Sequence, residues 1–90
     1  MEIVDIKSFV DGPILVEKDF LAKIDTFNWE KYRGEKALVR GCSDIVIPTW
    51  AYMVVASRLS EVASSIRYGN EHSNIVIYRR AKSAAHSEPE

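Results

Sequence analysis

Side chains that could do chemistry gather in one short stretch, where a predicted strand is followed by a predicted helix. Arg40 lies at the end of the strand, and Cys42, Ser43 and Asp44 come next. The connection after a strand is where α/β proteins usually bind ligands. The start of the helix would favour the thiolate of Cys42, because helix N-termini stabilise negative charge. Cys42 is therefore a candidate nucleophile, redox thiol or metal ligand, and the alternative is a small buried apolar side chain.

His72 is a second candidate for the same place. It follows the strand that ends at Tyr68, which should finish at the same sheet edge as the strand that ends at Arg40. Thiolate, imidazole and carboxylate groups are the usual ligands of zinc. Cys42, Asp44 and His72 are therefore the candidate metal ligands, with zinc or iron as the candidate cofactor, and a second copy of the chain is the alternative source of the ligands beyond Cys42 and His72. The alternatives are a solvated turn residue for His72 and a helix cap or turn for Asp44.

The same edge could instead bind a small ligand. Arg40 would pair with Asp44 there, or bind an anion close to the start of the helix. The candidate ligand-binding residues are Arg40, Ser43, Asp44 and Trp50. Ser43 lacks the G-x-S-x-G context of a hydrolase nucleophile, and the chain has no glycine-rich nucleotide-binding motif. We therefore expect a pocket at the carboxyl edge of the sheet, near the start of the second helix.

Hydrophobic periodicity predicts the elements that position this edge. Strand-like apolar patterns occur near residues 3–10, 37–41, 65–68 and 74–79. Apolar residues at helical spacing predict long helices near 17–27 and 48–63, with a further helical turn over 28–33. Pro48 suits the first position of the second helix, because its missing N–H would have no partner there.

The order β-α-β-α-β-β defines the fold class. Strands that alternate with helices indicate an α/β domain with a mostly parallel sheet, crossover connections and helices packed on the sheet. The link between the last two strands is too short for a crossover, so these strands should form an antiparallel hairpin. We expect one α/β domain over residues 1–80. Residues 81–90 have no apolar periodicity and should form a disordered tail.

Composition narrows the function classes. Of the 90 residues, 47% are hydrophobic and 28% are charged, and the formal net charge is −1. Such a chain lacks the basic field that nucleic-acid binding usually needs, so we expect no nucleic-acid partner. The longest apolar run, from Trp50 to Ala56, is far shorter than the about 20 residues that span a bilayer. With no signal peptide and a single cysteine, we expect a cytoplasmic protein without a membrane partner.

The second helix predicts a partner subunit. Its first two turns are apolar on every side, whereas a helix that lies on one sheet needs only one apolar stripe. Trp50, Tyr52 and Met53 therefore need cover that a small domain can hardly supply. We expect a homodimer related by a two-fold axis. The alternative is that Trp50 and Tyr52 cover neighbouring loops within one chain.

Several strings of residues resemble a known family. They are residues 20–24, Trp29-Glu30-Lys31-Tyr32, Gly41-Cys42-Ser43-Asp44, Ile47-Pro48-Thr49-Trp50-Ala51-Tyr52-Met53, Tyr68-Gly69 and Tyr78-Arg79-Arg80. Through them the chain resembles the uncharacterised bacterial proteins grouped as domain of unknown function 2480, over most of residues 3–80. Members of that family are about twice as long and look like two tandem copies. The resemblance therefore implies that this chain corresponds to one copy.

The resemblance implies no activity. In that family a cysteine often lies near the position of His72, and cysteine and histidine can replace each other as zinc ligands. The genes of the family tend to lie near those for iron–sulfur cluster assembly. Our main hypothesis is a non-enzymatic accessory or interaction protein, working as a homodimer or with a protein partner and linked to iron–sulfur or metal homeostasis. The alternative is a thiol-dependent enzyme or redox protein that uses Cys42.

Overall fold

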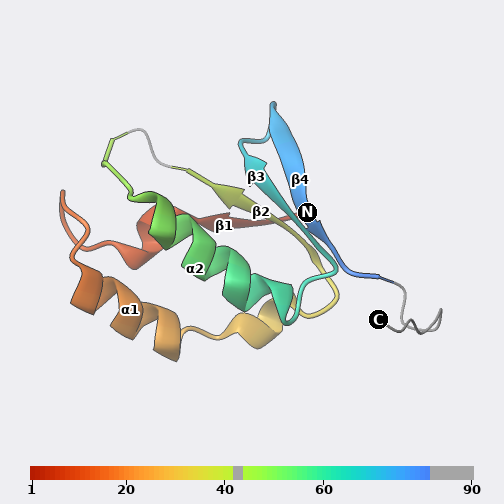
Figure 1. The fold of residues 1–90 in the computed structure, drawn as a ribbon, viewed down its shortest axis with the longest axis horizontal. Helices are drawn as coiled ribbons and strands as arrows, with labels where there is room; N and C mark the ends of the chain where they lie inside the picture. The colour runs from red at the N-terminus through yellow and green to blue at the C-terminus, as the bar shows by residue number, and fades with distance from the viewer. Residues whose placement is uncertain (42–43, 82–90) are drawn as a thin grey trace.

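One mixed four-stranded sheet organises the chain, and two helices lie on one of its faces (Figure 1). The computed structural model describes residues 1–41 and 44–81. The strands are β1 (Glu2–Asp5), β2 (Lys36–Arg40), β3 (Ser65–Gly69) and β4 (Asn74–Arg79). The helices are α1 (Glu17–Thr26) and α2 (Thr49–Ser60), and two 3-10 helices, η1 (Ile6–Phe9) and η2 (Trp29–Tyr32), lie in the connections.

The strand order confirms the predicted α/β class. The strands lie in the order β1-β2-β3-β4, with β1, β2 and β3 parallel and β4 antiparallel to β3. Both predicted crossovers and the closing hairpin are therefore present. Because three neighbouring strands run the same way, their carboxyl ends meet at one edge. There Asp5 lies in register with Arg40, and Arg40 with Gly69.

The first strand is shorter than the sequence predicts. β1 ends at Asp5, whereas the apolar alternation predicts a strand over 3–10. The Asp5 carboxylate accepts a hydrogen bond of 3.0 Å from the backbone N–H of Lys7, and so caps the 3-10 turn η1. That turn still buries Ile6 and Phe9. The apolar pattern is thus satisfied by a turn, and the prediction of a strand beyond Asp5 is wrong.

Both long helices form close to their predicted places. α1 begins at Glu17 as predicted, and η2 supplies the helical turn expected over 28–33. α2 is shorter than the predicted range 48–63, and Pro48 precedes its first turn as the N-cap residue. Within the described residues, no helix has the length and apolar character that crossing a membrane would take.

The core lies between the helical layer and the sheet. Its fully buried residues include Val4, Phe20, Ile24, Ala37, Val39, Ala51, Val55, Leu59 and Ile66. Aromatic rings extend the core at the ends of α1: Phe9 stacks on Trp29 with ring centroids 5.7 Å apart. The indole N–H of Trp29 donates a hydrogen bond of 2.9 Å to the carbonyl of Ile24. This packing joins η1 and η2 to α1.

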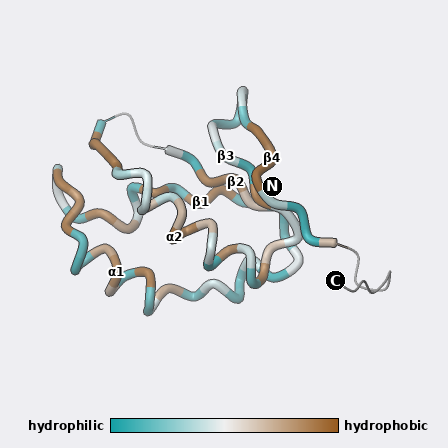
Figure 2. Tube along the Cα trace, in the orientation of Figure 1, coloured by the Kyte–Doolittle hydropathy of each residue, from teal (hydrophilic) through white to brown (hydrophobic). Residues whose placement is uncertain are grey.

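β4 forms the edge of the sheet and lies largely outside the cover of the helices. α2 packs on β2 and β3, and Ile75 and Ile77 of β4 stay 64% and 47% exposed. Figure 2 shows β4 as one of the strongly hydrophobic segments of the trace. The sheet therefore presents an apolar edge strand beside α2.

Candidate functional site

Arg40 organises the carboxyl edge of the parallel strands. Its guanidinium group donates one hydrogen bond of 2.9 Å to the carboxylate of Asp5 and another of 2.8 Å to the carboxylate of Glu71. The three residues come from the end of β1, the end of β2 and the turn after β3. Two of the N–H groups of its guanidinium group are thus occupied by carboxylates of the same chain.

These contacts shift the ionisation of both groups. Burial acts to raise the pKa of Asp5, but hydrogen bonds from the Lys7 N–H and from Arg40 outweigh it, so this pKa lies below its usual value. The hydrogen bond to Asp5 and the charge of Glu71 raise the pKa of Arg40. Both shifts favour the charged forms of Asp5 and Arg40, and the two hydrogen bonds of Arg40 fasten three segments of the edge together.

Asp44 and His72 lie on the surface near this edge. Arg40 does not pair with Asp44; the exposed Asp44 carboxylate lies 3.3 Å from the ammonium group of Lys7 instead. His72 is exposed in the turn after β3, where its backbone N–H donates a hydrogen bond of 2.8 Å to the side chain of Asn70. The neighbouring Glu71 reaches Arg40, so this turn does lie at the predicted edge.

The candidate thiol and metal chemistry rests on residues that the structure does not describe. Cys42 and Ser43 both lie outside the described residues. Within residues 1–41 and 44–81, no group of three or more histidine, cysteine and acidic side chains is arranged to hold a metal. The predicted site of Cys42, Asp44 and His72 therefore stays a prediction.

Trp50, the fourth predicted ligand-binding residue, packs between the helices. Its ring meets Phe20 of α1 edge to face, with centroids 5.5 Å apart. Phe20 is almost completely buried and Trp50 is half-buried. Part of the cover that Trp50 needs thus comes from its own chain.

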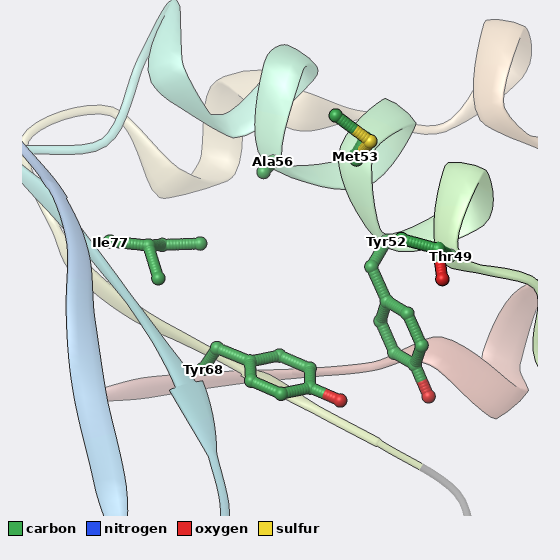
Figure 3. Close-up of a pocket in the computed structure, with 6 residues that line it drawn as sticks. All are labelled: Thr49, Tyr52, Met53, Ala56, Tyr68 and Ile77. Carbon is green, nitrogen blue, oxygen red and sulfur yellow. The ribbon is translucent and has the colours of Figure 1, made fainter.

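A surface hollow lies on the other side of α2, toward β4. Its volume is about 330 Å³, at the small end of the range for ligand pockets. Six described residues line it: Thr49, Tyr52, Met53, Ala56, Tyr68 and Ile77. Figure 3 shows that they come from α2, β3 and β4, with the two tyrosine rings side by side at one end. None of these six residues is charged.

The two tyrosines meet above the end of β2. Their rings pack edge to face, with centroids 5.2 Å apart. A Cβ atom placed on Gly41 would lie 3.1 Å from the hydroxyl oxygen of Tyr52 and 3.6 Å from that of Tyr68. Both hydroxyl groups therefore reach the chain where β2 ends, and Gly41 leaves them the room. The hollow thus has a polar end near the carboxyl edge and an apolar body along α2.

A β-bulge in β4 adds to the apolar character of the hollow. Tyr68 lies opposite Ile75, and Ile66 lies opposite Tyr78, but the register between these pairs shifts so that Ile77 has no partner in β3. A bulge of this kind re-aims a side chain. Ile77 accordingly turns toward α2 and lines the hollow, on the side of the sheet that also carries Tyr68 (Figure 3).

The result is an exposed apolar surface that spans α2, β3 and β4. Met53 is 66% exposed, Ile75 64%, Ile77 47% and Tyr68 38%. Met53, Ile77 and Tyr68 line the hollow, and Ile75 lies opposite Tyr68 in register. We call these four side chains and the hollow the apolar face. Isolated exposed apolar residues are ordinary, whereas several gathered around one hollow mark an interaction site.

Sequence reasoning identified only part of this surface. It identified Tyr52 and Met53 from the all-round apolar start of α2. It missed Tyr68, Ile75 and Ile77, which periodicity assigned to ordinary strands. A signal was present: residues 75–78 form an uninterrupted apolar run, and the charged Arg79 comes only at the end of β4. Edge strands are usually interrupted by charges or a proline.

Comparison with known proteins gives a family. A family model described as "Protein of unknown function (DUF2480)" matches residues 1–88, nearly the whole chain. The chain belongs to this family. No curated protein and no solved structure matches it. The DUF2480 description assigns no activity, so the function of this member has to be argued from its geometry.

Proposed function

We propose that this DUF2480 protein is a non-enzymatic interaction protein that works as a homodimer through the apolar face. One observation carries the proposal: Met53, Tyr68 and Ile77 are exposed around a hollow without charged lining residues. The exposed Ile75 extends this surface, since it lies opposite Tyr68 in register. Removing apolar surface from water is favourable by about 25 cal/mol per Å². A partner that covered this face would therefore gain binding free energy from contacts that the single chain leaves unmade.

A second copy of the chain suits this surface on charge grounds. A two-fold interface brings the same patch of both copies together, so a charged patch would face its own charge. The lining of the hollow is uncharged, and the whole chain has a formal net charge of only −1. Two copies can therefore approach through this face without like-charge repulsion.

The arrangement supports binding better than catalysis. The hollow offers apolar side chains and hydroxyl groups, and the strongest charged cluster at the sheet edge is already paired within the chain. General acid–base catalysis needs a titratable group positioned against the substrate. The hollow's six lining residues include tyrosine hydroxyls but no histidine, carboxylate or amine.

Sedimentation of the purified protein tests the proposal. At micromolar concentrations we expect a species of twice 10.2 kDa, the mass of the chain. Met53→Asp should return it to 10.2 kDa, because an unpaired carboxylate would be buried in the interface. Ile14→Asp is the matched control: Ile14 is 69% exposed, like Met53, but precedes α1. A wild-type protein that stays at the mass of one chain would refute the homodimer.

The biological setting of the dimer is the remaining part of the proposal. The link to iron–sulfur or metal homeostasis rests on the family resemblance, and the thiol-dependent alternative rests on Cys42. We propose the cytoplasm as the place of action. The single cysteine supports this, since a lone thiol cannot form an internal disulfide and suits a reducing compartment.

A further inference from the structure

In residues 1–41 and 44–81 the four strands carry two α-helices, and this leaves a position beside α2. α2 lies over β2 and β3. The hollow occupies the place next to it, bounded by Met53 and Ala56 on α2 and by Ile77 on β4 (Figure 3). In layered α/β proteins a strand with an apolar face is covered by another element. The hollow therefore has the position that a further helix would take.

The bulge in β4 indicates which side of the strand the partner uses. β4 could in principle pair through its free edge with β4 of a second copy. However, the register shift at Ile77 disrupts the ladder, and bulges on edge strands are a known protection against edge pairing. The same bulge places Ile77 in the hollow. A second copy would therefore bind the side of β4 that faces α2 more readily than the free edge of the strand.

The apolar face carries both a protruding side chain and a cavity, next to each other. Met53 is 66% exposed at the rim of the hollow, and the rings of Tyr52 and Tyr68 form the wall at one end. Methionine side chains are flexible and make favourable sulfur–aromatic contacts. A two-fold axis requires that whatever one copy inserts, the other receives in the same place. The exposed Met53 side chain beside the hollow meets this condition, because each copy can insert its Met53 and receive that of the other.

No charge on α2 hinders a second copy of the chain from packing beside Met53 and Ala56. Arg58, the one charged residue of α2, donates a hydrogen bond to Asp25 of α1, so its charge is used within the chain. Ala56, one turn after Met53, is small. A second helix could therefore come close to α2 there without steric or electrostatic conflict.

We propose that the two copies of α2 lie side by side across the two-fold axis, and that Met53 of each copy enters the hollow between α2 and β4 of the other. This arrangement rests on the homodimer proposed above and adds its geometry. Met53 then lies close to the axis. Val76, which lies on the opposite side of the sheet from the hollow, opposite Arg67 in register, lies away from it.

Disulfide trapping tests this geometry. In a Cys42→Ser background, Met53→Cys should convert under mild oxidation from a 10.2 kDa band to a covalent dimer, because disulfides form only between Cα atoms within about 7 Å. Val76→Cys should remain monomeric on the same gel, and so should Ile14→Cys, the exposed control near α1. Circular dichroism and sedimentation of each reduced variant show that it folds and associates like the parent.

The outcomes separate the two proposals. A parent that dimerises while Met53→Cys fails to cross-link overturns this arrangement and leaves the homodimer standing. Cross-linking of Val76→Cys as strong as that of Met53→Cys overturns it too, in favour of pairing between β4 edges. A parent that stays at 10.2 kDa in sedimentation refutes the homodimer and this geometry together.

Discussion

Tyr52 of α2 and Tyr68 of β3 pack edge to face at an interplanar angle of 79°, and they join the helix to the sheet at one end of the hollow. The pair closes the polar end of the hollow against Gly41. It also keeps one face of Tyr68 available, since this side chain is 38% exposed. The same contact thus stabilises the single chain and shapes the surface that we propose for dimerisation.

Tyr68→Ala should weaken both the fold and the dimer. The loss of an edge-to-face pair, with the removal of the ring, is expected to lower the free energy of unfolding by about 1–3 kcal/mol. The dimer should dissociate about tenfold more easily, since the hollow loses one wall. Urea unfolding and sedimentation measure the two effects. Tyr68→Phe keeps the ring and should change neither by much; equal effects of both variants would mean that the hydroxyl group, not the ring, matters.

Gly69→Ala should be strongly destabilising. Gly69 ends β3 with a backbone conformation that favours glycine, and it leaves no room for a side chain. Its φ is +140°, and an added Cβ would lie 2.3 Å from the carbonyl oxygen of Ser73. We expect a loss of about 2 kcal/mol or more in the free energy of unfolding. Gly34→Ala is the control: its φ is +76° but no atom lies within 4 Å of the added Cβ, so a loss nearer 1 kcal/mol is expected. Similar losses would show that the contact with Ser73 does not matter.

The sequence predicted most of the architecture, because local patterns determine it. Apolar periodicity located β2, β3 and β4, and the short link after β3 required a hairpin. The clear error was the strand over 3–10. There the pattern of buried residues was right, but Asp5 uses its side chain to cap a turn, and a strand and a 3-10 turn can bury the same apolar residues.

The candidate site was harder to predict because its contacts join distant parts of the chain. Arg40 binds Asp5 and Glu71, which lie 35 and 31 residues away in sequence. Spacing alone favoured the nearby Asp44. The bulge at Ile77 was equally hidden, since residues 75–78 are uniformly apolar and give no sign of where the alternation breaks. What the sequence did show was that the start of α2 needs cover.

Asp5→Asn should lower stability at neutral pH, by an amount that disappears in acid. Asparagine can still cap η1 but cannot pair with Arg40, so we expect a loss of no more than about 1 kcal/mol for this partly exposed pair. The pKa of Asp5 is lower in the folded chain than in the unfolded one. Its contribution is therefore present above the unfolded pKa, near 3.9, and is lost as the pH falls through the lower folded value.

Urea unfolding of wild type and Asp5→Asn at pH 7 and near pH 3 measures this difference. The gap between the two proteins should narrow at the lower pH. Glu30→Gln is the matched control, because Glu30 pairs with Arg33 through similar contacts but on an exposed turn. A gap for Asp5→Asn that stays constant with pH would show that lost packing, and not lost charge, causes it.

Metal analysis decides between the remaining chemical hypotheses for the carboxyl edge. A zinc or iron ion held by Cys42, Asp44 and His72 should be present in protein purified under reducing conditions, and should be lost in Cys42→Ser and in His72→Ala. His86→Ala, at the other histidine of the chain, should keep it. Elemental analysis gives the metal content of each variant.

The contrary results are equally informative, because a thiolate that binds a metal no longer reacts as a free thiol. Wild-type protein without metal, or His72→Ala protein that keeps it, contradicts the metal site. Titration of Cys42 with a thiol reagent then separates the other two roles. Labelling at neutral pH in the folded protein indicates an accessible thiolate and supports the redox alternative, whereas labelling only after unfolding indicates a buried structural cysteine. If Cys42 reacts only after unfolding and the protein is a dimer, neither a metal nor a reactive thiol acts at the carboxyl edge. The apolar face is then the one functional surface proposed for this chain that stands.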